Sequence, residues 1–173
     1  MRSTVSVLSL IRVVLATISL TCLMDIYPNI CNAIVQHGGV KCFCLVLERS
    51  MGFVDLNEAC IKALEKISIE NPHAVLTSGA IGLILNMIDF FEISTQKRII
   101  GILLNISRHS ASEADLNEHL LPIVPALCMF LHSRGGGDES GQKIESVSLI
   151  VLKIFESIFR FISPVSQPEK VGV

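Results

Sequence analysis

The 173-residue sequence predicts an all-α fold built from stacked helical repeats. Apolar residues recur three and four positions apart along most of the chain, while proline and glycine interrupt them at regular distances. No run of alternating apolar and polar residues indicates a strand. The most complete repeat runs from Asn71 to His109, beginning at Asn71-Pro72 and turning at Ser78-Gly79. Two apolar segments follow, divided by Glu92 to Thr95.

The composition agrees with a folded protein and argues against several classes of function. Half of the residues are hydrophobic, 17% are charged and the formal net charge is -2. The chain is therefore too apolar to be disordered, and it lacks the basic excess that would favour nucleic acid. We expect protein partners, with no cofactor and no small-molecule substrate.

The six cysteines are expected to be reduced and buried, because a chain of this length can bury a core without disulfides. No Cys-x-x-Cys motif occurs, and the side chains of Cys42 and Cys44 would point to different faces of a helix. The histidines show no spacing typical of metal ligands. We therefore predict neither a metal site nor a redox site, and no catalytic residue.

The N-terminal segment allows two interpretations. Val5 to Met24 is long enough to cross a bilayer, and Arg2 before an apolar run resembles a signal peptide. Arg12 lies near the middle of that run, where a charge costs roughly 2.5 to 3.5 kcal/mol. We favour a packed helix that ends a partial repeat at 1–27, with a membrane anchor or secretion signal in residues 1–24 as the alternative. The core-facing stripe of this helix would consist of Leu8, Ile11, Leu15, Ile18 and Cys22, broadened by Val14 and Leu23.

The next repeat is expected at about residues 28–70. Pro28 has a preset φ angle that suits the start of a short helix over Asn29 to Gln36. Gly38-Gly39 ends that helix, and an apolar helix follows over Val40 to Leu47.

The long last helix of this repeat is predicted to begin at a capping box. Asp55 can accept hydrogen bonds from free backbone amides, and Glu58, three residues later, would complete the motif. The apolar side of the helix would carry Leu56, Cys60, Ala63, Leu64 and Ile67.

Constant offsets align this repeat with the one at 71–109. Gly38 and Gly79 differ by 41 positions, and Leu64 and Leu103 differ by 39. A period near 40 with helices and no strand signal is typical of the armadillo and HEAT classes. We therefore expect a right-handed α-α superhelix of armadillo type.

A third copy is expected at about 119–163, which completes an array over residues 1–163. Leu121 to Leu131 match the middle helix and Lys143 to Ile158 match the long one, with extra residues in a glycine-rich loop between them. Leu149 to Leu152 is apolar on every side, which is typical of a helix buried between two neighbours. Because the tail at 164–173 is a poor helix, we expect an uncapped end, as in a fragment or a poorly soluble chain.

Several segments resemble a known family, namely Leu23 to Pro28, Ala33 to Val40, Asp55 to Ser68 and Leu85 to Phe91. They are similar to the armadillo region of HECT-type E3 ubiquitin ligases of the plant KAKTUS and animal thyroid-receptor-interactor type. The resemblance covers roughly Thr21 to Ile158. It implies a fragment or truncated member that recognises protein substrates in the cytoplasm or nucleus. The catalytic HECT domain of that family has no counterpart here, so the resemblance gives no cysteine a catalytic role.

One set of side chains is predicted to bind partners, because the last helices of armadillo repeats line a groove. Lys97, Gly101, Asn105 and Arg108 are spaced by 4, 4 and 3 positions and so share one helical face. Asn105 resembles the ladder asparagine that holds an extended peptide in peptide-binding armadillo proteins. The candidate groove residues are Lys62, Lys66, Lys97, Asn105 and Arg108, with a plain solvated surface as the alternative.

The ladder asparagine is expected to be absent from both neighbouring repeats, where Lys66 and Ile154 stand at the positions equivalent to Asn105. An offset of 49 from the second repeat places Ser146, Ile150, Ile154 and Ser157 at the equivalent positions. The predicted positive charge therefore lies on the first two full repeats, where an acidic segment of a partner could bind.

Overall fold

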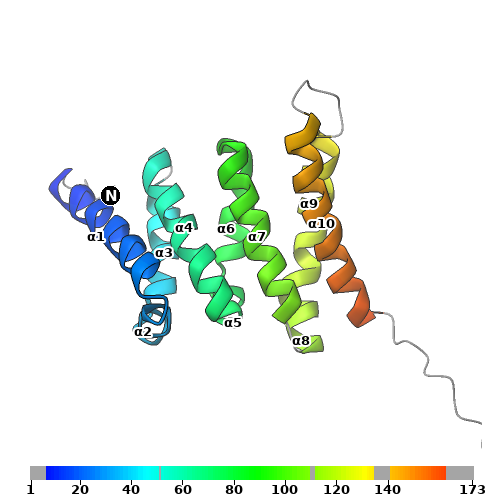
Figure 1. Ribbon diagram of the computed structural model, residues 1–173, viewed down its shortest axis with the longest axis horizontal. Helices are drawn as coiled ribbons and strands as arrows, with labels where there is room; N and C mark the ends of the chain where they lie inside the picture. The colour runs from blue at the N-terminus through cyan, green and yellow to red at the C-terminus, as the bar shows by residue number, and fades with distance from the viewer. Residues whose placement is uncertain (1–6, 51, 110–111, 135–140, 163–173) are drawn as a thin grey trace, which may run out of the picture.

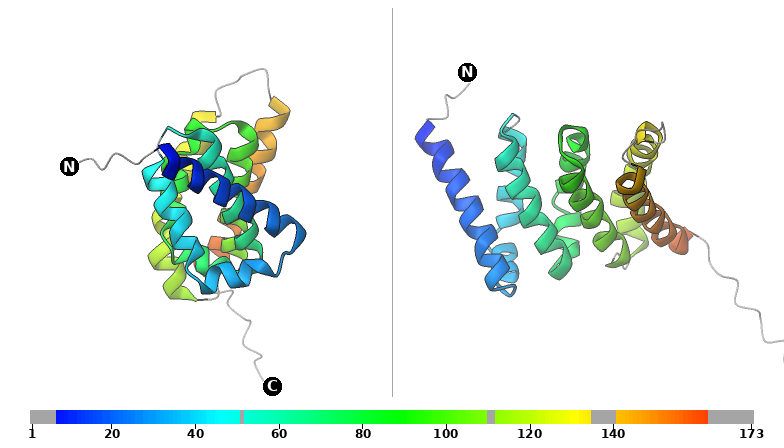
Figure 2. Two further views of the ribbon diagram at one scale, coloured as in Figure 1. Left: turned by 90° about the vertical axis from the view of Figure 1, so that its left-hand side faces the viewer. Right: turned by 45° about the horizontal axis from the view of Figure 1, so that its top comes forward.

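A computed structural model describes residues 7–50, 52–109, 112–134 and 141–162. Every regular element within these residues is a helix (Figure 1). The long helices are α1 (Val7–Ile26), α4 (Val54–Glu70), α7 (Ile93–His109) and α10 (Gly141–Ile162). They lie side by side in chain order, each packed against the next, as Figures 1 and 2 show. The predicted all-α repeat stack is confirmed.

Shorter helices form the rest of each repeat. In chain order they are α2 (Ile30–Gln36), α3 (Gly39–Arg49), α5 (Pro72–Leu76), α6 (Ala80–Asn86), η1 (Ile88–Phe90), α8 (Glu113–Asp115), η2 (Leu116–Leu120), η3 (Leu121–Ile123) and α9 (Val124–Arg134). The axes of α2 and α3 are bent by 76°. The first full repeat thus consists of a short, a middle and a long helix.

Two glycines form the sharp turns between the short and middle helices. Gly38 precedes α3 with a φ angle of 76°, and Gly79 precedes α6 with a φ angle of 83°. This left-handed conformation is unfavourable for residues that carry a Cβ atom. The 41-residue offset in the sequence therefore aligns two equivalent turns.

Rows of buried side chains give the register of the long helices. One row has a spacing of 4, 3 and 4 positions in each of three helices: Leu56, Cys60, Ala63 and Ile67 in α4; Thr95, Ile99, Ile102 and Ile106 in α7; and Val147, Val151, Ile154 and Ile158 in α10. This pattern aligns α10 with α7 at an offset of 52. The predicted offset of 49 is wrong, because Ile154, expected in the groove, is fully buried.

A second buried row in α4 and α7 faces the following repeat. It consists of Asn57, Ile61, Leu64 and Ser68 in α4, and of Gln96, Ile100, Leu103 and Ser107 in α7. The equivalent apolar residues of α10 include Leu152 and Phe159, each of which is 57% exposed. Leu149 is also exposed, whereas Val151 is buried. Within the described residues, only one side of the apolar run from Leu149 to Leu152 is therefore covered. Within the part of the chain that the structure describes, this outer side of α10 is left exposed, as expected.

α1 packs against α4 through a different face from the predicted one. Thr17, Thr21 and Met24 are buried, whereas the predicted stripe is exposed at Ile11, Leu15, Ile18 and Cys22. The side chain of Leu8 lies outside the described residues. Because α1 is apolar around most of its circumference, its periodicity could not determine which face packs. The Thr21 hydroxyl donates to the carbonyl of Thr17 at 2.7 Å, so this buried hydroxyl has a hydrogen-bond partner.

Among the described residues, no single helix is both long enough and apolar enough to cross a membrane. Taken together, the bent pair α2 and α3 is long and apolar enough, by length and composition only.

The turn into α4 does not contain the predicted capping box. α4 begins at Val54 with Phe53 as its N-cap residue, and no side chain makes a capping hydrogen bond there. Instead, Ser50 donates to Oδ1 of Asn57, while Nδ2 of Asn57 donates to the Ser50 carbonyl at 3.3 Å. This buried pair connects the turn to the helix, and Glu58 points toward the next repeat.

All six cysteines are free, as predicted. Only half of them are buried, however: Cys31, Cys44 and Cys60 are enclosed, whereas Cys22, Cys42 and Cys128 are exposed. Burial raises the pKa of the Cys60 thiol to about 12, so this thiol stays protonated at neutral pH.

Candidate protein-interaction surface

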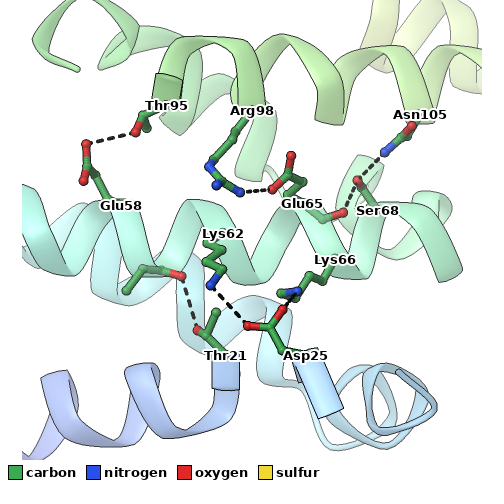
Figure 3. A network of polar contacts seen from close by, with 11 residues as sticks. Thr21, Asp25, Glu58, Lys62, Glu65, Lys66, Ser68, Thr95, Arg98 and Asn105 are labelled. Atoms are coloured by element: carbon green, nitrogen blue, oxygen red, sulfur yellow. Dashed lines mark hydrogen bonds and ion pairs between the residues drawn. The ribbon is translucent and has the colours of Figure 1, made fainter. Parts of the chain in front are cut away.

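The outward sides of the long helices form one surface, which we name the long-helix face. It includes Asp25 on α1; Glu58, Lys62, Glu65 and Lys66 on α4; and Lys97, Asn105 and Arg108 on α7. Figure 3 shows part of this surface, with α4 between α1 and α7. All five predicted groove residues belong to it, so the structure places them on adjacent helices.

Asp25 links α1 to two of the predicted groove lysines. Its Oδ2 atom lies 3.2 Å from Nζ of Lys62, and its Oδ1 atom accepts a hydrogen bond from Lys66 (Figure 3). The hydrogen bonds from Lys66 and then Lys62 lower the pKa of Asp25 below its usual value. Lys62 and Lys66 are therefore already paired with a carboxylate of their own chain.

Polar side-chain contacts join α4 to α7 (Figure 3). Thr95 donates to Glu58 at 2.9 Å, Arg98 donates to Glu65, and Nδ2 of Asn105 donates to Oγ of Ser68 at 3.0 Å. The predicted ladder asparagine thus forms a hydrogen bond within the stack.

The partners of these residues were not predicted from the sequence, although the spacing between partners contains a signal. Asp25 and Lys62, Glu58 and Thr95, and Ser68 and Asn105 are each 37 positions apart. This separation is slightly shorter than the repeat, so it brings a residue opposite its partner on the next long helix. Complementary polar residues at that separation would have identified the contacts.

Lys97 and Arg108 differ from the other predicted cations. Lys97 is half-buried and Arg108 is exposed, and neither forms an ion pair with a described residue. They are 11 positions apart on α7, which corresponds to about 16 Å along the helix axis. The ammonium group of Lys97 and the guanidinium group of Arg108 are therefore available to a partner.

The corrected register adds residues of α10 to the long-helix face. At an offset of 52, Gly101 and Arg108 correspond to Lys153 and Arg160, both of which are exposed. Arg160 donates to Glu156 at 2.6 Å, whereas Lys153 has no ion pair in the described part of the chain. The side chain of Ser146, expected here from the sequence, lies outside the described residues. Unpaired positive charge on this face thus gathers on α7 and α10.

α1 gives its end of the face an apolar character. Ile11, Ile18 and Asp25 follow one another at intervals of seven residues, so their side chains share one side of the helix. The two isoleucines are 48% and 45% exposed. The long-helix face therefore changes from apolar at α1, through internally paired charges at α4, to unpaired positive charge at α7 and α10.

Metal coordination needs several His, Cys, Asp or Glu side chains close together. No cluster of three or more such side chains is suitably placed among the described residues.

Comparison with known proteins identifies relatives of this helical-repeat stack. Residues 10–77 match the family model of the TPR repeats of TRIP12-like E3 ubiquitin-protein ligases. The chain is 35% identical over 140 residues to the E3 ubiquitin-protein ligase UPL4 and 31% identical over 143 residues to UPL3, both from Arabidopsis thaliana. These alignments cover 81% and 83% of the chain, which spans 9% and 7% of the length of the two relatives. No solved structure gives a significant match.

The fold and the long-helix face define the class of this chain as an α-solenoid repeat region. Residues 10–77 match the repeat region of TRIP12-like E3 ubiquitin ligases, and most of the chain is similar to a short part of two plant E3 ubiquitin-protein ligases. The resemblance to HECT-type ubiquitin ligases that its sequence indicated is therefore confirmed. The family description names TPR repeats, which contain two helices, whereas the first full repeat here contains three, α2, α3 and α4.

Proposed function

We propose that this chain is a non-catalytic protein-interaction region that recognises protein substrates for HECT-type ubiquitination in the cytoplasm or nucleus. Homology to repeat regions of E3 ubiquitin ligases supports the link to ubiquitination. The observation that supports binding is the unpaired positive charge of Lys97, Arg108 and Lys153 on two adjacent long helices.

The proposed partner presents an acidic segment to α7 and α10. A single exposed ion pair contributes roughly 0.2 to 1 kcal/mol, so recognition requires several contacts made together. Lys97 and Arg108 are separated by about 16 Å, which a linear segment of about five extended residues can span. Lys62 and Lys66 contribute less, because Asp25 already neutralises part of their charge.

The experiment measures binding of a fluorescein-labelled, 15-residue peptide rich in Asp and Glu to the full chain by fluorescence anisotropy. The triple variant Lys97→Glu, Arg108→Glu and Lys153→Glu should weaken binding at least tenfold, and added salt should weaken wild-type binding. Lys41→Glu is the matched control, since Lys41 is an exposed cation on α3, outside the long-helix face. Equal affinity of the triple variant and the control would contradict the proposal.

A link to substrates requires a second measurement with natural partners. Proteins captured by the tagged chain should be lost with the triple variant and retained with Lys41→Glu, as quantified by mass spectrometry. The set lost should be enriched in proteins whose ubiquitination falls when the corresponding ligase is removed. If the lost proteins show no such enrichment, the face binds peptides without recognising substrates. That result would refute the ubiquitination part of the proposal.

Exposed apolar residues of α1 favour a second candidate function. Ile11, Leu15 and Ile18 could contact lipid in a small helical protein that is anchored in a membrane or secreted through residues 1–24. Retention in membranes after alkaline carbonate extraction would support an anchor, and N-terminal cleavage detected by intact mass would support secretion. Release of the uncleaved chain would support the interaction region.

A further inference from the structure

We propose that one edge of the stack binds an amphipathic helix of a partner protein through two apolar pockets. The first pocket, of about 290 Å³, lies between α1 and α3 and is lined by residues that include Val13, Leu45 and Arg49. The second, of about 360 Å³, lies between the start of α4 and the segment after α6, and its lining includes Val54 and Phe90. Neither pocket includes any of the predicted groove residues.

The two pockets are the same structural feature in successive repeats. Val46, Arg49 and Ser50 line the first pocket, and the residues 41 positions later, Met87, Phe90 and Phe91, line the second. This is also the offset between Gly38 and Gly79, which start the middle helices of the two repeats. Because packed helices lie about 8 to 10 Å apart, the pockets are separated by roughly 10 Å.

In the middle of the stack, from α2 to α7, exposed apolar side chains concentrate around these pockets. Among the described residues of α2 to α7, the large hydrophobic side chains with high exposure are Leu45, Phe53, Val54, Ile69 and Phe90. All except Ile69 line one of the two pockets, and Phe90 is 77% exposed. Clusters of exposed apolar surface mark interaction sites more often than scattered single residues do.

The pocket volumes fit single side chains of a partner. A cavity of about 150 Å³ is large enough for benzene, so each pocket can hold one Leu or Phe side chain. Both volumes are near the lower limit of about 300 Å³ for small-molecule sites. Arg49 is the charged residue of the first pocket and has no ion pair with a described residue. An acidic residue beside the first apolar anchor would therefore find a partner.

A helix fits this edge better than an extended peptide does. The described residues offer no strand edge that could pair with an extended backbone, whereas a helix satisfies its own backbone hydrogen bonds. Apolar residues at positions i and i+7 of a helix lie about 10.5 Å apart on one side. This distance matches the spacing of the two pockets.

The probe is a fluorescein-labelled, hydrocarbon-stapled 15-residue helix with Leu at positions i and i+7 and Glu beside the first Leu. Anisotropy with the full chain should show binding that falls at least tenfold when both Leu residues are replaced by Ala. Leu45→Glu and Phe90→Glu should each weaken binding at least fivefold. Ile69→Glu is the matched control, because Ile69 is 58% exposed on α4 but outside both pockets, and it should change binding less than twofold.

Two further measurements test which end of the probe lies beside Arg49 and whether the probe must be helical. Arg49→Glu should weaken binding, and replacing the Glu of the probe by Lys should restore it. An unstapled probe with a central proline, which cannot form the helix, should bind at least tenfold more weakly. Circular dichroism checks that each variant keeps its helical content.

The proposal would be overturned if the Ala probe bound as tightly as the Leu probe. It would also be overturned if Leu45→Glu and Phe90→Glu both bound the Leu probe as the wild type does. If the proline probe bound as tightly as the stapled probe, the partner would not need to be helical, and that part of the proposal would be overturned. The triple variant Lys97→Glu, Arg108→Glu and Lys153→Glu should bind the stapled probe as the wild type does, so the outcome is independent of the long-helix face.

Discussion

Asn105 of α7 donates a hydrogen bond from Nδ2 to the Oγ atom of Ser68 in α4, at 3.0 Å. Ser68 is fully buried, and its own hydroxyl donates to the carbonyl of Glu65 at 2.6 Å. The amide that resembles a peptide-binding ladder residue therefore connects two repeats of the same chain.

Asn105→Ala should lower the free energy of unfolding by about 1 kcal/mol, the typical net contribution of one hydrogen bond. In a double-mutant cycle with Ser68→Ala, the two losses should sum to more than the loss in the double variant, because both variants remove the same contact. Urea unfolding measures each stability. Strictly additive losses would show that the Asn105–Ser68 contact contributes nothing.

Ile61→Ala should destabilise the chain by about 2 to 5 kcal/mol, since this side chain is fully buried in the row that faces the next repeat. Ile69→Ala, on the same helix and 58% exposed, is the matched control and should change stability by less than about 0.5 kcal/mol. Urea unfolding compares the two variants. Similar losses for both would contradict the placement of α4 between α1 and α7.

Asp25 should make stability dependent on pH in the acidic range. Its pKa in the folded chain is lowered by the hydrogen bonds from Lys66 and Lys62, so its contribution is fully present above the pKa of the unfolded chain, about 3.9. That contribution is lost as the pH falls through the folded pKa. The wild type should therefore lose more stability between pH 6 and pH 2 than Asp25→Asn does.

Carbon-13 NMR titration provides a direct measurement of the Asp25 carboxyl group. Lys66→Gln should raise its pKa more than Lys62→Gln, because the hydrogen bond from Lys66 is the larger cause of the shift. An Asp25 pKa that is the same in both variants and the wild type would show that the lysines do not hold this carboxylate in solution.

Thiol labelling should divide the cysteines into two groups of three. Cys22, Cys42 and Cys128 are exposed and should react with N-ethylmaleimide in the native chain at pH 7. Cys31, Cys44 and Cys60 should react only after denaturation, because burial removes them from the reagent and raises the pKa of each thiol. Intact mass spectrometry counts the labels. Six labels on the native chain would contradict the packing around Cys60.

The parts of the fold that depend on local sequence were predicted well. Gly38 and Gly79 mark equivalent turns because each requires a positive φ angle, and Pro72 occupies the first position of α5. The predicted helix over Asn29 to Gln36 matches α2 to within one residue. The prediction of a capping box at Asp55 was wrong. Ser50, before the turn, and Asn57, after it, hold the turn by hydrogen bonds to each other.

The candidate site was harder to predict, because its partners come from different repeats. Spacing along α7 placed Lys97 and Arg108 on one face, yet it could not show that Asp25 pairs with Lys62 and Lys66. The register of α10 was wrong by three positions, so Lys153 was missed. A glycine-rich connection of unusual length has no periodicity from which a register can be counted.

The sequence by itself determined the helices, the 41-residue repeat of the glycine turns and the resemblance to E3 ubiquitin ligases, since each depends on local conformation or on similarity to relatives. Only the tertiary structure decided which face of α1 packs, that Asn105 bonds to Ser68, and which cations remain unpaired. The physical reason is that an apolar helix has several faces able to pack, and a polar side chain has several possible partners. Contact with the neighbouring repeat selects among them.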